Sequence, residues 1–437
     1  MREIGIALFG LGNVGLGSFR ILAQHAPVIE ERLGARVRVR HAVVRDAMRD
    51  RGEPEAAKVL TTDAARALDD PEVSVVVELI GGVTAARDLV LEAIARGKHV
   101  VTANKALLSA YGEEVFAAAR AHGVDVYFEG AVCGGIPIIR TIREALAADR
   151  IRSIHGIVNG TTNFILSAMS DERQDYARAL EKAQSLGIAE AEPTLDVSGM
   201  DAAQKLCLLA SLAFRARLVP AQLHVEGITG IDPIDVEAAR EFGYALKLLA
   251  VARRDGDDAI EARVGPAFIP RKAPLAEVRG AFNAVLLESA ALGPSLLFGQ
   301  GAGALPTGSA VVADILDVCR NVLAGISGRI PLPSGPNLLG VPVRPHTDRV
   351  GAYYLRFTVQ DEPGVLGRIA TVLGEQRVSI ASLVQRAEPR GAEGSATIQI
   401  FTHDAREGDV RAAVARIDAL ASTLAPTKVI RIEHPVT

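Results

Sequence analysis

The sequence Ile4-Gly-Ile-Ala-Leu-Phe9-Gly10-Leu-Gly12-Asn13-Val14-Gly15 decides the fold of the first part of the chain. Its apolar beginning is typical of a buried parallel strand. A G-x-G-x-x-G pattern follows at once, and a helical pattern of apolar residues comes after it. Glycines placed between a strand and a helix allow a tight turn and a close approach of the backbone to a pyrophosphate. The stretch therefore predicts a Rossmann-type dinucleotide-binding domain, and the alternative is a tight turn without a ligand. The predicted cofactor-binding residues are Gly10, Gly12, Asn13, Val14 and Gly15.

The second predicted strand covers residues 37–44 and ends at Arg45, a position that commonly distinguishes two cofactors. An acid there bonds the ribose hydroxyls of NAD, whereas a guanidinium suits the 2′-phosphate of NADP. Here Arg45 comes first and Asp46 second. This order favours NADP(H) as the cofactor, although Asp46 leaves NAD(H) open. The alternative is that Arg45 is a solvated surface residue that binds neither cofactor.

Lys105 follows a strand that is predicted to end at the ligand-binding edge of the same sheet. Residues 73–80 and 99–102 have the composition of further buried strands, and Ala103-Asn104-Lys105 follows the second of them. Ligands of such folds bind at the carboxyl ends of the strands. Lys105 is therefore a candidate to face the nicotinamide and the substrate, and the alternative is a surface lysine at a helix start.

Three acids and one lysine gather in the middle of the chain, within residues 183–205. Glu192 and Asp196 lie on a predicted loop that a proline and a glycine shape. Asp201 is expected near the start of an apolar, buried helix, with Lys205 one turn later on the same face. A lysine entering a buried helix needs partners, which clustered acids can supply. The alternative is an ordinary acid–lysine pair on a helix surface.

This stretch also resembles the signature of homoserine dehydrogenases, almost position for position. In that family the lysine that ends the motif is the general acid/base, and the acids hold it and bind the substrate ammonium group. A second lysine lies between the cofactor and the substrate. The residues that the resemblance assigns to catalysis are Lys205, Lys105, Asp201 and Asp196, and Glu192 is assigned to substrate binding.

Two further segments resemble parts of the same family. Residues 124–137 look like its strand-to-loop segment, in which a glutamate carbonyl and alternate backbone carbonyls bind a sodium ion. The resemblance assigns these ligands to Glu129, Val132, Gly134 and Ile136. Residues 299–309 look like the segment that returns to the nicotinamide, which would bring Gly303 to the cofactor. Residues 288–293 depart from the Gly-Asp-x-x-Gly that commonly precedes this segment, so the local turn stays open.

The C-terminal part predicts a small regulatory domain behind a proline-rich linker at residues 331–349. Residues 350–437 carry the strand and helix pattern of a βαββαβ ferredoxin-like fold. The sequence Asp361-Glu-Pro-Gly364-Val-Leu-Gly367 resembles the opening of an ACT domain, with Asp361 as helix cap and Pro363 near the first turn. The resemblance implies an amino-acid effector such as L-threonine. An oligomerisation domain without a ligand is the alternative.

The composition argues against several classes of function. The 437 residues carry 48 basic and 52 acidic side chains, a formal net charge of −4, which does not favour a broad nucleic-acid surface. Only 4% of the residues are aromatic and none is Trp, so stacking on bases is not expected. No apolar run reaches the length of a membrane span, and no signal-peptide pattern is present. Three scattered cysteines suit a reducing compartment, and we expect a cytoplasmic location.

Together these segments predict an α/β protein of three domains. The Rossmann-type domain covers residues 1–140 and is closed by about residues 301–330; an α+β substrate and dimerisation domain covers residues 141–300; and the ACT domain covers residues 350–437. The resemblance extends over essentially the whole chain. It implies the reversible NAD(P)H-dependent reduction of L-aspartate 4-semialdehyde to L-homoserine, on the route to threonine and methionine, by a homodimer or homotetramer.

Two other functions fit parts of the sequence. A phosphorylating semialdehyde dehydrogenase would use Cys133 as its nucleophile, although a cysteine among small apolar residues is usually a buried packing residue. An amino-acid sensor with a vestigial dinucleotide fold would bind its ligand at the C-terminal domain without turnover. The acid–lysine motif counts against both alternatives.

Overall fold

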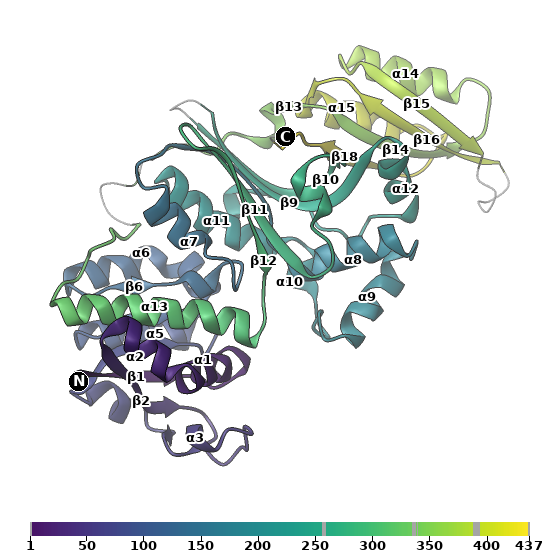
Figure 1. The fold of residues 1–437 in the computed structure, drawn as a ribbon. Helices are drawn as coiled ribbons and strands as arrows, with labels where there is room; N and C mark the ends of the chain where they lie inside the picture. The colour runs from purple at the N-terminus through teal and green to yellow at the C-terminus, as the bar shows by residue number, and fades with distance from the viewer. Residues whose placement is uncertain (1, 256–258, 334–337, 339, 388–393, 436–437) are drawn as a thin grey trace. The chain divides into compact units, whose positions relative to one another are not determined.

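The computed structural model describes residues 2–255, 259–333, 338, 340–387 and 394–435 (Figure 1). The contacts within it divide the chain into two compact units. The first unit contains residues 1–160, 201–222 and 281–341, and the second contains residues 161–200, 223–280 and 342–437. Each unit therefore combines segments that lie far apart in the sequence.

A six-stranded parallel sheet forms the core of the first unit. Its strand order is β3-β2-β1-β4-β5-β6, and every neighbouring pair is parallel. The strands are β1 (Arg2–Phe9), β2 (Ala35–Val43), β3 (Leu60–Thr61), β4 (Val73–Glu78), β5 (His99–Thr102) and β6 (Val126–Tyr127). The helices between them are α1 (Asn13–Gln24), α2 (Ala26–Leu33), α3 (Pro54–Ala57), α4 (Ala64–Asp69), α5 (Thr84–Ala95) and α6 (Lys105–Ala121). This strand order is that of a Rossmann-type fold and confirms the predicted fold class.

A helix from much later in the chain, α13 (Ala304–Ala324), packs beside α1 (Figure 1). Gly17 and Gly308 lie where the two helices approach each other. A Cβ atom on Gly17 would lie 2.0 Å from the carbonyl oxygen of Ala304, and one on Gly308 would lie 2.8 Å from the carbonyl carbon of Gly17. Only glycine fits at this crossing, which brings Ile315 of α13 into the core of the parallel sheet.

The remainder of the first unit includes three strands that pair antiparallel in the order β12-β11-β7. Its strands are β7 (Ile151–Ile157), β11 (Phe282–Ser289) and β12 (Gly293–Gln300); the helices are α7 (Ile138–Arg140) and α11 (Met200–Phe214), with shorter turns η1 (Glu129–Ala131), η2 (Thr141–Ala145) and η3 (Pro220–Gln222). The turn that the sequence left open is a hairpin, in which Gly293 has a φ of +77°. The Asp149 carboxylate accepts the N–H groups of Ala291 and Leu292, each at 2.9 Å. These bonds close the hairpin without the glycine–aspartate pair common in the family.

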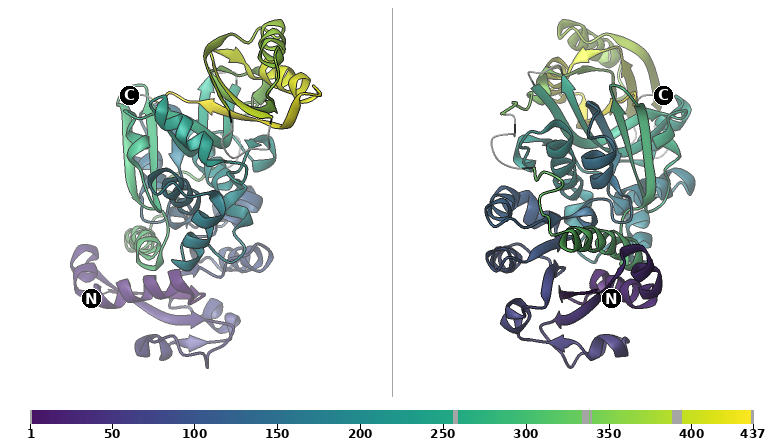
Figure 2. Two further views of the ribbon diagram at one scale, coloured as in Figure 1. Left: turned by 90° about the vertical axis from the view of Figure 1, so that its right-hand side faces the viewer. Right: turned by 60° about the vertical axis from the view of Figure 1, so that its left-hand side comes forward.

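A mixed sheet in the order β9-β10-β18-β14-β16-β15 organises the second unit (Figure 2). Its strands are β9 (Tyr244–Asp255), β10 (Ala259–Pro270), β14 (Tyr353–Gln360), β15 (Ile380–Ala387), β16 (Ser395–Thr402) and β18 (Thr423–Ile432), and β8 (His224–Val225) pairs with β10. The last strand, β18, runs parallel to β10, with Ile432 opposite Phe268. The N–H of Glu433 also donates to the carbonyl of Phe268 at 2.8 Å. The C-terminal module thus continues the sheet of β9 and β10.

Helices and short strands complete this unit. They are α8 (Gly160–Asp171), α9 (Tyr176–Ser185), α10 (Thr194–Val197), α12 (Pro233–Glu241), α14 (Val365–Glu375), α15 (Glu407–Asp418), η4 (Pro274–Glu277), η5 (His346–Asp348), β13 (Val350–Gly351) and β17 (Ala405–Arg406). Apolar side chains of α14 and α15 form a separate core with β14, β16 and β18. None of the helices that the structure describes is long and apolar enough to span a bilayer.

The first helix of the C-terminal module begins differently from the sequence prediction. Helix α14 starts at Val365 rather than at Pro363, and no side chain caps it. The predicted cap by Asp361 is therefore wrong. Gly364 has a φ of +87° and turns the chain into the helix, while the N–H of Asp361 donates to the carbonyl of Gly394 at 2.7 Å. The left-handed glycine supplies the change of direction that a capping side chain usually accompanies.

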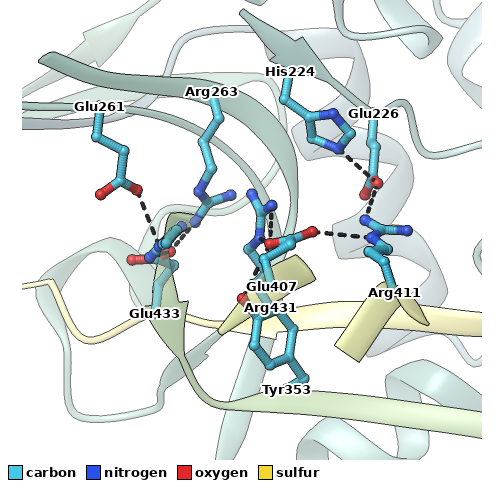
Figure 3. Close-up of polar contacts among 10 residues, drawn as sticks. His224, Glu226, Glu261, Arg263, Tyr353, Glu407, Arg411, Arg431 and Glu433 are labelled. Carbon is cyan, nitrogen blue, oxygen red and sulfur yellow. Dashed lines mark hydrogen bonds and ion pairs between the residues drawn. The ribbon is translucent and has the colours of Figure 1, made fainter. Parts of the chain in front are cut away.

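Two buried glutamates bind the second unit together through arginines (Figure 3). Glu433 follows β18 and is 1% exposed. Its carboxylate accepts from Arg253 of β9 at 2.7 Å, and it also pairs with Arg263 of β10 and with Arg349. Because Arg253 belongs to β9 and Arg263 to β10, these contacts attach the C-terminal strand to both.

The second glutamate, Glu407, opens α15 and is fully buried. It accepts from Arg431 of β18 at 2.6 Å, from the Tyr353 hydroxyl at 3.0 Å and from Arg411 at 3.0 Å. Arg411 also bonds Glu226, which follows β8, so Arg411 lies between two carboxylates (Figure 3). We call the residues of these two glutamate centres, together with Glu226, the arginine–glutamate network.

Candidate active site

The turn between β1 and α1 has the shape that the glycine pattern predicts. Gly10 has a φ of +98°, and a Cβ atom on it would lie 2.5 Å from the carbonyl oxygen of Leu79. A Cβ atom on Gly15 would lie 2.2 Å from the carbonyl oxygen of Gly10. A Cβ atom on Gly12 would meet no atom within 4 Å. The outer glycines are thus required by packing, whereas Gly12 leaves open space beside the helix start, where a phosphate would bind.

Arg45 and Asp46 differ in their freedom to reach a ligand. Both are exposed at the end of β2. The Asp46 carboxylate accepts the N–H groups of Met48 at 2.9 Å and of Arg49 at 3.3 Å, so it holds its own turn. This arrangement commits the acid to the loop and leaves the guanidinium of Arg45 at the strand end.

Lys105 is the first residue of α6, and its backbone is fixed by the residue before it. The Asn104 side chain accepts the N–H of Leu107 at 3.0 Å and so caps the helix. The Lys105 side chain is 34% exposed, and its Nζ lies 3.2 Å from Oδ1 of Asp201. The two residues come from different parts of the sequence, and their meeting brings the strand-end lysine to the central motif.

Asp201 lies in the first turn of α11 and is the centre of this cluster. Lys205 Nζ donates to Asp201 Oδ2 at 2.7 Å and to the carbonyl of Val158 at 2.7 Å. Asn159 Nδ2 donates to the same carboxylate oxygen at 2.8 Å. The side chains of Lys205 and Asp201 are only 12% and 10% exposed. Asn159 thus orients the acid.

The charges of the two lysines decide the ionisation of Asp201. Burial by itself would raise its pKa, but the charges of Lys205 and Lys105 and the hydrogen bonds from Lys205 and Asn159 hold the pKa well below its usual range. Asp201 is therefore a carboxylate at neutral pH. With both lysines protonated, one negative charge faces two positive charges. Such an excess suits a substrate oxygen on which negative charge develops.

Glu192 and Asp196 belong to the second unit, on the segment that leads to α11. Glu192 is exposed and accepts a hydrogen bond from the Thr194 hydroxyl. Asp196 is half-buried and lies in the short helix α10. Their roles beside Lys205 stay predictions.

The segment from Glu129 to Ile136 is sharply turned and, except for Gly135, buried. The Glu129 carboxylate accepts the N–H groups of Ile139 and Arg140, each at 2.8 Å, and burial raises its pKa to about 7. Cys133 and Gly134 are consecutive residues with positive φ angles of 56° and 49°. The glutamate side chain is thus committed to the protein, which leaves only backbone oxygens of this segment for a cation.

Cys133 is poorly suited to act as a nucleophile. Its side chain lies in the turn just described and is 1% exposed. Burial raises the pKa of the thiol to about 11, so almost none of it is thiolate at neutral pH. The structure therefore disfavours the phosphorylating dehydrogenase considered above.

The glycine-rich segment before α13 packs on this turn. A Cβ atom on Gly134 would lie 2.6 Å from the carbonyl oxygen of Gly301, and one on Gly301 would lie 2.1 Å from the amide of Asn283. Gly303 precedes α13 with a φ of +135°. The assignment of Gly303 to the cofactor stays a prediction. The buried Asn283, which lies against Gly301, was not predicted from the sequence.

Family comparisons cover nearly the whole chain. The model described as homoserine dehydrogenase matches residues 137–316, the model of the homoserine dehydrogenase NAD-binding domain matches residues 10–129, and the ACT domain model matches residues 353–422. The homoserine dehydrogenase of Neisseria gonorrhoeae is 43% identical over 99% of both chains. That of Pseudomonas aeruginosa is also 43% identical, over 99% of this chain and 100% of its own. This chain belongs to the homoserine dehydrogenase family.

Solved structures of homoserine dehydrogenases agree with this membership. The structure from Thiobacillus denitrificans is 45% identical, covers 99% of both chains and superposes with a TM-score of 0.92. A hyperthermophilic archaeal homoserine dehydrogenase in complex with NADPH is 26% identical, covers 72% of this chain and 97% of its own, and has a TM-score of 0.61. As a member of this family, the chain is an NAD(P)-dependent oxidoreductase that acts on a CH–OH group.

Proposed function

We propose that this chain interconverts L-aspartate 4-semialdehyde and L-homoserine, with Lys205 as the general acid/base. The observation that carries the proposal is the position of Asp201 between Lys205 and Lys105, at 2.7 Å and 3.2 Å. Lys105 begins α6 at the carboxyl edge of the dinucleotide-binding sheet, and Asp201 and Lys205 lie on α11. The cluster therefore joins that edge of the sheet to α11. Biosynthesis of threonine and methionine is the corresponding pathway.

When bound, the reduced cofactor would supply the hydride for the aldehyde carbon, and the residues around the aldehyde oxygen would meet the negative charge that develops there. Lys205 gives that oxygen a proton and takes it back in the reverse direction. Asp201 holds the Lys205 ammonium by a hydrogen bond and a charge, and the carbonyl of Val158 fixes it from a second direction.

Three other residues hold the substrate in this proposal. Lys105 polarises the aldehyde oxygen together with Lys205. Glu192 binds the substrate ammonium group, for which an exposed carboxylate is suited. Asp196 supports Asp201 in holding Lys205.

NADP(H) is the proposed cofactor. Support comes from the end of β2, where Asp46 holds its own turn and Arg45 remains for a 2′-phosphate. The turn of Gly10, Gly12 and Gly15 would receive the pyrophosphate beside Asn13 and Val14 at the helix start. Gly303 would lie near the nicotinamide. Comparing NADP+ with NAD+ as oxidant tests this preference.

A sodium ion is proposed at the carbonyl oxygens of Glu129, Val132, Gly134 and Ile136. The ligand atoms that this buried turn offers are carbonyl oxygens, which suit a hard cation. The two left-handed residues within the turn allow the alternate carbonyls to converge. The ion would fix this turn beneath the active site.

Assembly and regulation belong to the same proposal. Leu296 and Phe298 of the edge strand β12 are 41% and 56% exposed, and Leu292 in the turn before it is 61% exposed. These exposed apolar side chains favour a homodimer or homotetramer. The ACT domain is the proposed site for an amino-acid effector such as L-threonine. Three free cysteines suit a cytoplasmic location.

The experiment that tests the function is oxidation of L-homoserine with NADP+ and NAD+ by the wild type and by Lys205→Ala. We expect turnover by the wild type and a loss in kcat of about 10²–10⁴-fold in the variant, with cofactor affinity retained. Lys182→Ala is the matched control, because Lys182 forms an exposed pair with Glu172. A wild type without turnover would favour the amino-acid sensor, and an active Lys205→Ala would move the acid/base role to Lys105.

A further inference from the structure

Glu78, the last residue of β4, is a buried carboxylate that the mechanism above does not use. It is 0% exposed. Among the residues that the structure describes, no cation forms an ion pair with it. An acid without a countercharge is costly to bury unless its oxygens are saturated with donors. The hydrogen bonds that Glu78 accepts therefore explain how an acid is tolerated at this buried position.

Four donors converge on Glu78. Oε1 accepts the N–H of Ile80 at 3.0 Å, that of Gly81 at 3.2 Å and, more distantly, Nδ2 of Asn104 at 3.5 Å. Oε2 accepts the hydroxyl of Thr102 at 2.6 Å. A carboxylate offers only acceptors and satisfies all four, whereas a glutamine would bring N–H donors into a group of donors. Glu78 thus ties the end of β4 to the end of β5.

The chain of contacts continues from Thr102 to the start of α6. The Thr102 hydroxyl accepts the N–H of Asn104 at 3.0 Å. Asn104 Nδ2 donates to the carbonyl of Gly82 at 2.7 Å, and Asn104 Oδ1 accepts the N–H of Leu107 at 3.0 Å. Asn104 is held from the strand side and caps the helix whose first residue is Lys105.

We propose that Glu78 is a positioning residue for the dehydrogenase reaction and acts through Thr102 and Asn104 on Lys105. This inference rests on the proposed role of Lys105. The Lys105 side chain is long and one-third exposed, so the place of its backbone at the helix start decides where its ammonium group can reach. Without the anchor, the helix start shifts and the ammonium group leaves its place 3.2 Å from Asp201. A misplacement of about 1 Å can lower a rate about 10²-fold.

The test is a double-mutant cycle between Thr102 and Lys105. Thr102→Val removes the hydroxyl without changing the shape of the side chain, and Thr102→Ser keeps the hydroxyl. We expect Thr102→Val to lower kcat/KM for L-homoserine about 10- to 100-fold, with the Kd of the cofactor within about threefold, and Thr102→Ser to recover most of the rate. In a Lys105→Ala background, Thr102→Val should have no further effect, because the residue through which it acts is gone.

Each contrary result has a distinct meaning. If Thr102→Val lowers the rate by the same factor with and without Lys105, the contact is merely structural and the inference is overturned. An unchanged rate in Thr102→Val overturns it as well. If Lys105→Ala alone keeps the wild-type rate, the proposed role of Lys105 fails first, and this inference with it. Should Thr102→Val not fold, the same cycle with Glu78→Gln gives the answer, since that change inserts donors at the anchor.

Discussion

In α11 and in α15, an acid of the first helical turn pairs with a cation four residues later. Lys205 Nζ lies 2.7 Å from Asp201, and Arg411 Nε lies 3.0 Å from Glu407. Both acids are buried, at 8% and 0% exposure. The pairs differ in what surrounds them, because Asp201 has the partly exposed Lys105 beside it, whereas Glu407 lies within the arginine–glutamate network.

The type of cation separates the two pairs further. A lysine ammonium is a compact group that can exchange a proton, whereas a guanidinium stays protonated and offers several donors in a fixed plane. Arg411 uses that plane to bond Glu407 and Glu226 at once. The same spacing thus holds the proposed proton donor in α11 and attaches the C-terminal module in α15.

The largest expected effect comes from exchanging the cation in α11. Lys205→Arg keeps the positive charge and the spacing to Asp201, but a guanidinium does not exchange a proton at neutral pH. We expect kcat for L-homoserine oxidation to fall about 10²–10⁴-fold, with little change in the free energy of unfolding. Steady-state kinetics and a denaturant titration measure the two quantities.

The reciprocal variant Arg411→Lys is the matched control for this exchange. One ammonium group cannot keep both bonds of Arg411, so this variant should lose stability while the folded enzyme keeps its kcat. If Lys205→Arg kept the wild-type rate, Lys205 would serve only as a charge, and the contrast between the two helices would disappear.

A smaller effect is expected from removing the charge at the centre of the network. Glu407→Gln leaves the buried guanidinium of Arg431 without its carboxylate. Breaking a buried pair in this way costs about 3–5 kcal/mol, which a urea titration measures as a loss in the free energy of unfolding. Glu375→Gln is the control, because Glu375 pairs with Arg416 at an exposed site and should contribute less than about 1 kcal/mol. Equal losses in both variants would show that the network is no more than a set of surface pairs.

The sequence predicted the features that depend on neighbouring residues. The strand, glycine pattern and helix of the first turn lie within one short segment, and the spacing from Asp201 to Lys205 is a single helical turn. Such features follow from backbone geometry and periodicity alone. The family resemblance extended them to a function.

The features that the sequence did not reveal depend on distant segments. Glu433 meets arginines from β9, from β10 and from the segment before β13, and no local pattern specifies such meetings. The close crossing of α1 and α13 at Gly17 and Gly308 is likewise a contact between the two ends of the dinucleotide-binding fold. At Asp361 a local pattern was misleading, because this residue type often caps helices but the left-handed Gly364 makes the turn into α14 instead.

The smallest expected effect is the part of the pH dependence of stability that Glu226 contributes. Burial would raise the pKa of Glu226, but the hydrogen bond with His224 and the charge of Arg411 lower it from 4.5 to about 2. A carboxyl group with a lower pKa in the folded state stabilises the fold above its unfolded pKa. That contribution is lost as the pH falls from 4.5 towards 2.

Glu226→Gln tests this expectation, since a glutamine does not titrate. The Tm of the wild type should exceed that of the variant at about pH 6, and the difference should shrink as the pH is lowered to about 3. Other acids titrate in both proteins, so only the difference between the two melting curves reports on Glu226. A constant difference would mean that the Glu226 carboxylate has the same pKa in the folded and unfolded states. Packing rather than the charge of Glu226 would then hold β8 and α15 together.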